Sequence, residues 1–302
     1  MTWNLVSYVI EKLGIEGTAW AMLTIMGGVL ICMVIPYLLG SFNFGLIISK
    51  KKYNDDIRNH GSGNAGTTNM LRTYGKGAAV LTLIGDMLKA VIAVMIGYLV
   101  LNLQIKDPNS GSILYYDKLG ASIAGLFVML GHMFPCFYKF KGGKGVATAG
   151  TVVLMINPIV FAILFIVFLI IVIGTKYVSL GSIMGLSLYP IVLVAFDGPG
   201  SAALFAVAMA CLVVYKHKDN IKRLRDGKES KLSFGKGSKK KVEDTPTPTE
   251  APSVEDSDDN YTECTGCKHL IPITRAKCAY CGTVNEKCPA DSGKKSKKKQ
   301  KK

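Results

Sequence analysis

One uncharged stretch of this chain is too long to belong to a soluble protein. Residues 17–49 form a run of 33 residues without Asp, Glu, Lys or Arg. A helix needs roughly 20 apolar residues to cross the hydrocarbon core of a membrane. Further apolar segments lie at residues 78–105, 119–137, 146–174, 178–196 and 202–215. Because a chain in lipid must satisfy its own backbone hydrogen bonds, this pattern predicts an all-α polytopic membrane protein.

The loops between these segments predict how the chain is oriented in the membrane. Residues 50–76, 139–144 and the segment from 216 onward are basic, which places them in the cytoplasm with the C-terminus. The N-terminal stretch and residues 106–118 are nearly balanced in charge and face outward. This arrangement needs an odd number of crossings. Asn157-Pro158 can break the fourth segment into two short helices, so we expect five to seven crossings of the cell membrane.

The last quarter of the chain differs in composition from the membrane domain, which we assign to residues 1–235. Residues 236–260 are rich in Pro, Thr and charge and are expected to be a disordered linker. Residues 261–288 form a small second domain, and residues 289–302 a polybasic tail. A lysine tail is most often simply solvated. Beside a membrane it can also touch anionic headgroups, so we expect lipid, and not nucleic acid, as its partner.

A loop rich in lysine and glycine separates two of the apolar segments. Residues 131–148 read GHMFPCFYKFKGGKGVAT, with lysines at 139, 141 and 144. Glycines let backbone N–H groups converge on an anion, and lysine supplies a compact positive charge. A loop that merely orients the neighbouring helices is the alternative. The clustering of Gly142, Gly143 and Gly145 beside Lys141 and Lys144 favours a phosphate-binding loop.

A second polar loop is predicted to face the same side of the membrane. Residues 55–77 read DDIRNHGSGNAGTTNMLRTYGKG, in which glycines alternate with hydroxyl and amide side chains. Such a loop can be no more than a turn. Its length, its hydrogen-bond donors and Arg58 favour a site for a polyol phosphate, because one arginine can bind two phosphate oxygens at once. The candidate substrate-binding residues here are Ser62, Asn64, Thr68 and Asn69.

Two charges lie within the second apolar segment. Asp86 and Lys89 are three residues apart and share one helical face. Charges inside a membrane segment usually face a cavity or each other, so the pair either anchors the helix or contacts substrate. His132 and Ser41 are placed near the cytoplasmic ends of their segments. Each is commonly a structural residue, and each stays a candidate because it lies close to a polar loop.

The segment after the last apolar run is amphipathic at helical spacing. Residues 215–229 read YKHKDNIKRLRDGKE. They predict a basic helix on the inner leaflet, or a helix that presents His217 and Asn220 to the site that both loops face.

These segments together resemble the three signature motifs of the acyl-phosphate:glycerol-3-phosphate acyltransferase family (PlsY). The resemblance is collinear over residues 38–229. It implies transfer of an acyl group from acyl phosphate to the 1-hydroxyl of sn-glycerol 3-phosphate, which yields lysophosphatidic acid and phosphate. It implies no cofactor for catalysis. The acyl chain would need an apolar groove between helices that opens to the cytoplasmic leaflet.

The resemblance also implies roles for individual residues. Ser41 and Arg58 match the essential serine and arginine of the first motif, although Lys50, Lys51 or Arg72 can also fill the second role. The glycerol-phosphate loop and the third motif match Gly142, Gly143, Lys144, Gly145, His217, Asn220 and Glu229. The base is either His217 or a phosphate oxygen of the substrate.

Four cysteines near the C-terminus are spaced as a metal site. Cys264, Cys267, Cys278 and Cys281 form two CxxC pairs separated by ten residues. Paired thiolates of this kind suit tetrahedral Zn²⁺. Two disulfides are the alternative, which conflicts with a reducing cytoplasm. We therefore expect a zinc ribbon that binds an unknown protein partner, a module that the acyltransferase family does not ordinarily carry.

Two other functions are compatible with parts of this pattern. A transporter of an anionic solute would place polar residues deep in several segments, whereas polarity here gathers at one face. A membrane-anchored interaction protein would work through the zinc ribbon above a degenerate enzyme domain. The complete motifs argue against degeneration.

Overall fold

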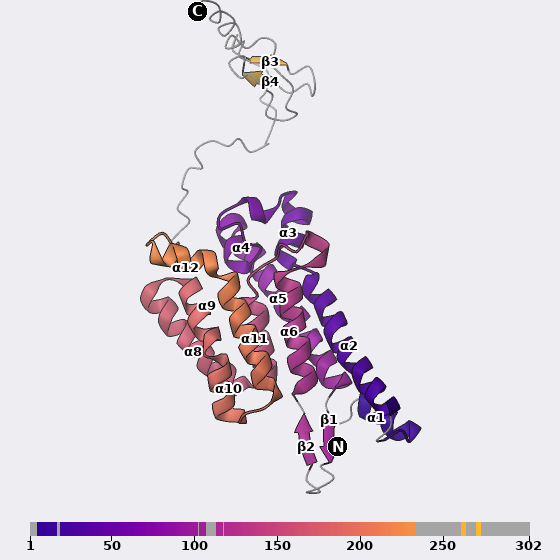
Figure 1. Cartoon of the computed structure of the whole chain (residues 1–302). Coiled ribbons are helices and arrows are strands. Elements are labelled where there is room, and N and C mark those ends of the chain that lie inside the picture. The colour runs from indigo at the N-terminus through magenta and orange to yellow at the C-terminus, as the bar shows by residue number, and fades with distance from the viewer. Residues whose placement is uncertain are drawn as a thin grey trace, which may run out of the picture. The chain divides into compact units, whose positions relative to one another are not determined.

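The chain divides into two compact units, residues 1–235 and 236–302. The computed structural model describes residues 5–16, 19–101, 103–106, 113–116, 118–232, 261–263 and 270–272 (Figure 1). The expected linker, the four cysteines predicted to bind zinc and the expected polybasic tail lie outside the described residues.

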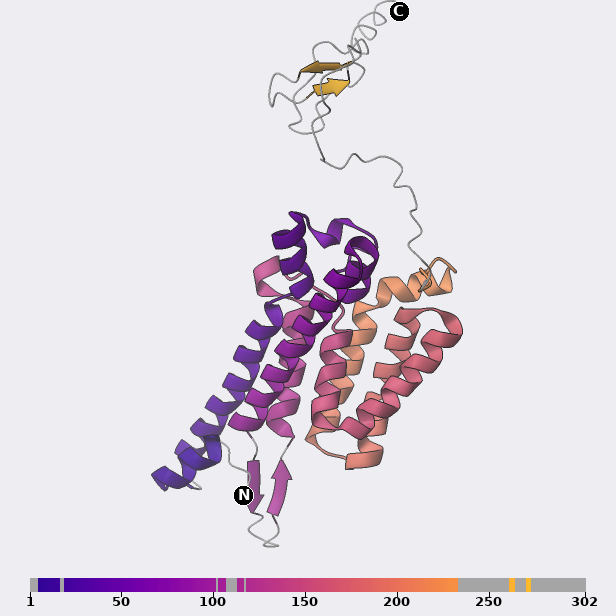
Figure 2. The same ribbon diagram turned by 180° about the vertical axis from the view of Figure 1, so that it is seen from behind.

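The first unit is a bundle of helices. Its helices are α1 (Leu5–Leu13), α2 (Ala19–Ser41), α3 (Phe44–Tyr53), η1 (Ile57–Asn59), α4 (Thr67–Tyr74), α5 (Lys76–Val100), α6 (Leu119–Met133), η2 (Cys136–Tyr138), α7 (Val146–Ile156), α8 (Pro158–Thr175), α9 (Val178–Ser187), α10 (Tyr189–Asp197), α11 (Ser201–Lys216) and α12 (Lys218–Arg225). α6 packs against α2, α5 and α11, and α8 packs against α9. Figure 2 shows the same bundle from behind.

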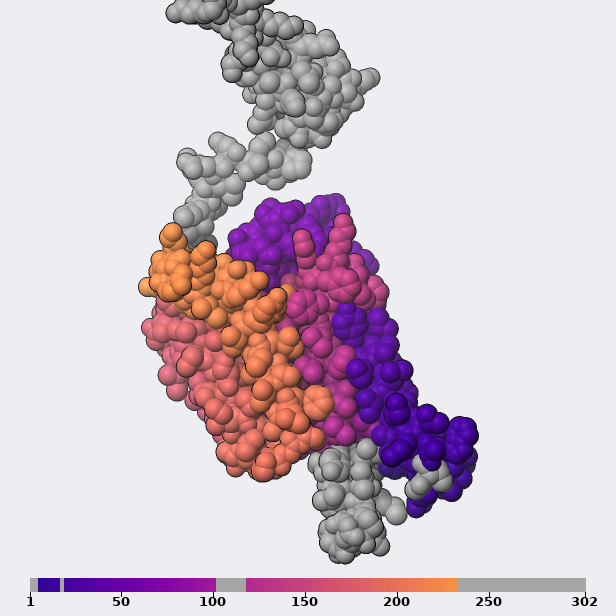
Figure 3. Space-filling model, in the orientation of Figure 1, coloured from indigo at the N-terminus to yellow at the C-terminus, as the bar shows by residue number. Residues whose placement is uncertain are grey.

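The bundle has the surface of a membrane protein. Among the described residues, five helices or helix pairs are long and apolar enough to span a membrane, and a sixth is the pair α11–α12, which bends by 56°. Large apolar side chains point outward, including Met22 at 71% exposure and Ile170 at 66%. In the space-filling view, α11 lies beside α6 (Figure 3), and α12 packs against α9. The expectation of an all-helical polytopic membrane fold is confirmed, with five or six spans in the part described.

The fourth apolar segment is broken where the sequence predicts. α7 ends at Ile156, and α8 begins at Pro158. The side chain of Asn157 accepts hydrogen bonds from the N–H groups of Ile159 and Val160 and so caps α8. Proline at the first helical position costs nothing, because its missing N–H would have no helical partner there. The result is a hairpin in which α7 packs against α8.

Small residues let α2 and α6 approach closely at the end of the bundle that carries the polar loops. A Cβ on Gly40 would overlap the carbonyl oxygen of Val128, and one on Gly131 would overlap that of Tyr37. Close contact of backbones at small residues stabilises helix pairs in membranes, where apolar burial gives little driving force. Gly40 precedes Ser41 and Gly131 precedes His132, so this contact fixes two candidate site residues.

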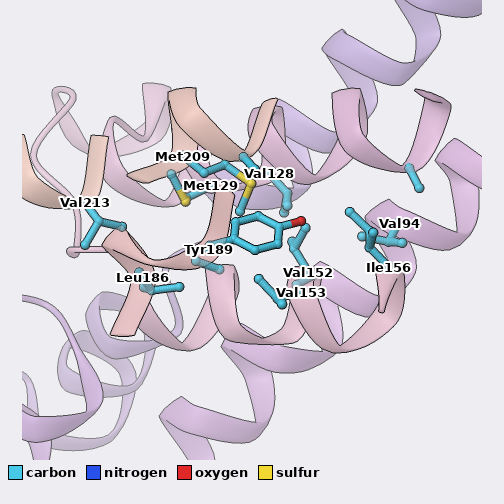
Figure 4. Packing of buried hydrophobic residues seen from close by; sticks show 14 of the residues in the cluster. Val94, Val128, Met129, Val152, Val153, Ile156, Leu186, Tyr189, Met209 and Val213 are labelled. Atoms are coloured by element: carbon cyan, nitrogen blue, oxygen red, sulfur yellow. The ribbon is translucent and has the colours of Figure 1, made fainter. Parts of the chain in front are cut away.

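The main core lies between the two halves of the bundle. Tyr189 of α10 is 1% exposed and sits among Val128, Met129, Val152 and Met209 (Figure 4). These residues come from α6, α7 and α11, so the core joins helices that are distant in sequence. It holds the α6–α7 loop in a fixed position relative to α11.

Two features of the first unit, a β-hairpin and a short helix, were not predicted from the sequence. Strands β1 (Leu103–Lys106) and β2 (Ile113–Tyr116) form an antiparallel hairpin, so α5 ends earlier than its apolar segment. α1 is a short amphipathic helix that precedes the first span and buries Val6. In the second unit, β3 (Tyr261–Glu263) pairs antiparallel with β4 (Leu270–Pro272).

Candidate active site

The three polar stretches of the sequence meet at one end of the bundle. η1 and α4, the loop from η2 to α7, and α12 all lie at the end opposite the β1–β2 hairpin (Figures 1 and 2). Arg58 donates from Nη1 to the carbonyl oxygens of Tyr138 and Lys141, at 3.3 and 3.2 Å. Arg72 donates to the carbonyl oxygen of Ser230 at 3.3 Å. The loops that the sequence places on one side of the membrane are therefore in direct contact.

Asn69 holds the first polar loop in shape. Its Nδ2 donates to the carbonyl oxygens of Ile57, His60 and Asn64, and its Oδ1 accepts from the N–H of Ser62. The side chain is 2% exposed. An amide has two donor hydrogens, and these three carbonyls occupy them. In this structure Asn69 stabilises the conformation of the loop. Contact of Asn69 with substrate stays a prediction.

The contacts of Arg58 are likewise with other residues of the protein. It forms a two-point ion pair with Asp56, with an Nη2–Oδ2 distance of 2.6 Å and an Nε–Oδ1 distance of 2.9 Å. Hydrogen bonding from Arg58 lowers the pKa of Asp56. The guanidinium therefore joins the first polar loop to the glycine-rich loop, and contact of Arg58 with substrate stays a prediction.

The glycines of the second loop are needed for a reason other than the expected one. The N–H groups of Gly142 and Gly143 donate to the carbonyl oxygens of Met133 and His132, at 3.3 and 3.1 Å. The expectation that they point at an anion is wrong, because those donors are occupied. A Cβ on Gly142 would overlap the His132 carbonyl, and one on Gly143 would overlap the His132 ring. The glycines let the loop fold onto the end of α6.

Donors for an anion come instead from the start of α7. Gly145 caps this helix at its N-terminus with φ of 75°, a conformation that favours glycine, and no side chain caps it. The first N–H groups of a helix have no partner within the helix and carry a partial positive charge. Lys144 precedes this helix end directly. A helix N-terminus beside a lysine is a typical phosphate site.

Lys144 belongs to a polar network that joins the glycine-rich loop to α12. Its Nζ donates to Oδ1 of Asn220, whose Nδ2 donates to Oε1 of Glu229 at 2.6 Å. Glu229 also accepts from Ser179 at 2.7 Å and from Nε of Arg223 at 2.8 Å. Residues from α9 and α12 thus converge on one carboxylate, and Asn220 connects that carboxylate to Lys144.

Burial and charge set the protonation of this network. Desolvation lowers the pKa of Lys144 to about 8, and the positive charge of Arg223 adds to the effect. Burial alone would raise the pKa of Glu229, but hydrogen bonds from Ser179, Arg223 and Asn220 outweigh it and lower that pKa. Near pH 7 the site therefore holds an ammonium that is poorly solvated. Such a group gains strongly from an anionic ligand.

Ser41 and His217 are buried beside these loops. Ser41 is 0% exposed; its Oγ donates to the carbonyl oxygen of Tyr37 at 2.9 Å and accepts from the N–H of Cys136 at 3.4 Å. His217 lies at the bend between α11 and α12, where its Nδ1 is 2.8 Å from the carbonyl oxygen of Val213. A carbonyl can only accept, so Nδ1 carries the proton and Nε2 is the acceptor of the neutral ring.

The remaining candidates differ in their distance from this network. Ser62 and Lys141 are exposed, whereas Asn64 and Thr68 are half-buried. Asp86, Lys89 and His132 are buried together, at no more than 4% exposure each. Direct contact of these seven with substrate stays a prediction.

Two residues of this network were not predicted from the sequence. Ser179 lies at the start of an apolar helix, and Arg223 is one of several cations in a basic segment. Only their shared contact with Glu229 distinguishes them. Its position as a polar residue at the end of a membrane segment was the available signal for Ser179.

The geometry defines a membrane protein with a cationic, phosphate-type site at one end of its helices. A family model described as "Glycerol-3-phosphate acyltransferase" matches residues 30–227. A glycerol-3-phosphate acyltransferase of Syntrophomonas wolfei is 42% identical over 201 residues, covering 67% of this chain and 95% of the relative. One from Paraburkholderia xenovorans is 40% identical over 225 residues, covering 74% and 99%.

Solved structures agree with these matches. A crystal structure of PlsY (YgiH), an integral membrane glycerol 3-phosphate acyltransferase, in its glycerol 3-phosphate form is 37% identical with a TM-score of 0.60. The match covers 68% of this chain and 96% of that one. The lysophosphatidic acid form matches with a TM-score of 0.57 at 35% identity. The chain belongs to the glycerol-3-phosphate acyltransferase family.

Proposed function

We propose that this protein acylates the 1-hydroxyl of sn-glycerol 3-phosphate with acyl phosphate as the donor, giving lysophosphatidic acid and phosphate. The observation that carries the proposal is the network of Lys144, Asn220 and Glu229 beside the open N-terminus of α7. The similarity to PlsY in its glycerol 3-phosphate and lysophosphatidic acid forms supports the acceptor and the product. The polar loops and the C-terminus face the cytoplasm in this proposal.

The site suits a reaction between two phosphorylated molecules. The acceptor hydroxyl oxygen attacks the acyl carbon, its proton passes to a base, and the bond to the phosphate oxygen breaks with the electron pair on phosphate. Lys144 and the first N–H groups of α7 hold a phosphate group. The base is either Nε2 of His217 or a phosphate oxygen of the substrate. Because phosphate is a good leaving group, orientation of the two reactants supplies most of the rate.

Purified protein in lipid tests the proposal. Given palmitoyl phosphate and glycerol 3-phosphate, it is expected to release phosphate only when both are present, and to form lysophosphatidic acid in equal amount. Palmitoyl-CoA and palmitoyl–acyl carrier protein, supplied separately, are expected to give no product. Turnover with either of these instead of palmitoyl phosphate would overturn the donor assignment.

The pKa of Lys144 predicts how substrate capture depends on pH. Because this pKa is lowered to about 8, the ammonium is present below pH 8 and lost above it. The second ionisation of a phosphate monoester lies near pH ~6, so the substrate itself does not titrate here. We therefore expect kcat/KM for glycerol 3-phosphate to fall as pH rises from 8 to 10. Lys144→Arg stays charged and should show no such decline, and a decline that persists there would contradict the assignment to Lys144.

The C-terminal unit supports a second, separate proposal, that Cys264, Cys267, Cys278 and Cys281 bind one Zn²⁺. These cysteines lie outside the described residues. β3 ends at Glu263 and its antiparallel partner β4 begins at Leu270, so the chain between two paired strands carries the first CxxC pair. Two strands that flank such a pair are typical of zinc knuckles and ribbons. The role of this module would be to bind a protein partner.

Metal analysis of the full chain tests this proposal. Protein purified without chelators is expected to contain about one zinc per chain, and Cys267→Ser with Cys281→Ser should lose it. Cys288→Ser, outside the pattern, is the matched control and should keep it. Acyl transfer should persist in all of these, because residues 236–302 form their own unit. Zinc that remains in the double variant, or four thiols that titrate only after reduction, would refute the site.

A further inference from the structure

A buried group of charged residues lies next to the proposed site without facing solvent. Asp86 is 1% exposed, Lys89 4% and His132 3%. The Lys89 ammonium is 2.8 Å from Oδ1 of Asp86 and 2.9 Å from Nδ1 of His132. Asp86 and Lys89 come from the middle of α5, whereas His132 is at the end of α6. The group joins two helices through Lys89 and His132, which are 43 residues apart in the sequence.

Lys89 also reaches a third helix, at Ser41. Its Nζ donates to the carbonyl oxygens of Gly40 and Phe42, at 3.1 and 3.0 Å. These two residues flank Ser41, the last residue of α2. The final carbonyls of a helix lack partners within it and carry a partial negative charge, so a buried ammonium there acts as a cap.

The hydrogen-bond donors of Lys89 are directed at groups of the protein. An ammonium has three hydrogens, whereas Lys89 has four acceptors within 3.1 Å: two carbonyl oxygens, a carboxylate oxygen and a ring nitrogen. In this structure the acceptors supplied by the protein are therefore enough for all three hydrogens. The cluster therefore acts on the protein itself.

His132 carries the effect of Lys89 to the glycine-rich loop. Nδ1 of the His132 ring lies 2.9 Å from the Lys89 ammonium and 3.4 Å from Oδ1 of Asp86, so both members of the pair fix this edge of the ring. The other edge of the ring fills the place where a Cβ of Gly143 would be. The His132 carbonyl accepts from the N–H of Gly143 at 3.1 Å. His132, which Lys89 orients, therefore fixes the backbone position of Gly143 and of Lys144, the next residue.

We propose that Lys89, held in place by Asp86, is a positioning residue that aligns Ser41 with the loop carrying Lys144. It fixes the carbonyl groups on both sides of Ser41 and, through His132, the backbone at Gly143. This inference rests on the proposed acyl transfer. It explains why a charged pair is kept inside a membrane segment, where charges are costly and usually serve function.

The experiment compares Lys89→Met with Asp86→Asn in purified protein, using kcat per folded molecule. Lys89→Met removes the hydrogen bonds to the carbonyl oxygens of Gly40 and Phe42 and the contact of the ammonium with His132. We expect kcat to fall about 100-fold, since small misalignments of reacting groups have effects of that size. KM for palmitoyl phosphate should change much less, because no phosphate ligand is lost. Asp86→Asn keeps the ammonium and its carbonyl bonds, so it should lower the unfolding temperature while kcat stays within a few-fold of wild type.

Lys118→Met is the matched control at the opposite end of the bundle. Lys118 also forms an ion pair, with Asp197 at 2.6 Å, but it caps the start of α6, the end opposite His132. It should leave kcat unchanged. Should Lys89→Met not fold, Lys89→Met with Asp86→Leu removes the unpaired carboxylate, and we expect it to fold with kcat still low.

Two results would overturn the positioning role. One is a wild-type kcat in folded Lys89→Met or in the double variant. The other is an equal loss of kcat in Asp86→Asn and Lys89→Met. That result would mean that the ion pair only stabilises the packing of α5. Absence of turnover in the wild type would instead mean that the proposed reaction has failed.

Discussion

Replacing Lys144 by methionine is expected to reduce kcat/KM for glycerol 3-phosphate by about 10²–10³-fold, the usual effect of removing one partner of a desolvated charge pair. Lys144 is half-buried, its pKa is depressed by desolvation, and it lies between Asn220 and the start of α7. Methionine keeps the length and the apolar stem of lysine, so the variant removes the charge with little change in packing. Phosphate release at limiting glycerol 3-phosphate, in protein of verified fold, measures the effect.

Lys139→Met is the control for this prediction. Lys139 lies on the same loop and has the same charge, but it is exposed. Solvated charges at the rim of a site contribute little, so kcat/KM should change less than about threefold. Equal losses in the two variants would mean that the loop attracts phosphate only through its net charge, and Lys144 would lose its assigned place.

The general fold could be predicted because the membrane imposes strong limits on a sequence. Long uncharged runs give spanning helices, and the basic loops gather at one end of the bundle, as expected. The break at Asn157-Pro158 was also predictable, because proline and a capping asparagine act locally. The β1–β2 hairpin was not. Residues 103–106 are partly apolar, and only pairing with residues 113–116 distinguishes a strand from the end of a helix there.

The site was predictable as a set of residues but not as a set of contacts. The motifs pointed to Lys144, Asn220 and Glu229, and the structure joins them in one network. They also suggested that Asp86 and Lys89 touch either substrate or each other. The structure shows the ion pair, and Lys89 also donates hydrogen bonds to the carbonyl oxygens of Gly40 and Phe42, whereas contact with substrate stays a prediction. Such long-range pairing depends on how helices pack, which a linear pattern does not record.

Gly143→Ala is expected to raise KM for glycerol 3-phosphate at least tenfold and to lower kcat. The sequence alone suggests that a methyl group would obstruct the approach of the anion. The structure gives a different cause, because the new Cβ would lie 2.9 Å from Cε1 and 3.0 Å from Cδ2 of His132 and would overlap Nε2. Overpacking of a rigid site displaces the backbone. The ring cannot yield easily, since Lys89 holds it, so the loop and Lys144 must move.

Gly77→Ala is the matched control, because a Cβ on Gly77 has open space around it. This variant should keep wild-type kinetics. The two causes are separated by combining Gly143→Ala with His132→Ala. If the methyl group collides with the ring, the double variant should be no worse than His132→Ala alone, because the space is then free and the two effects are not additive. If it obstructs the anion, the losses should multiply. Steady-state kinetics of the four proteins of this cycle, with kcat and KM determined separately, distinguish these outcomes.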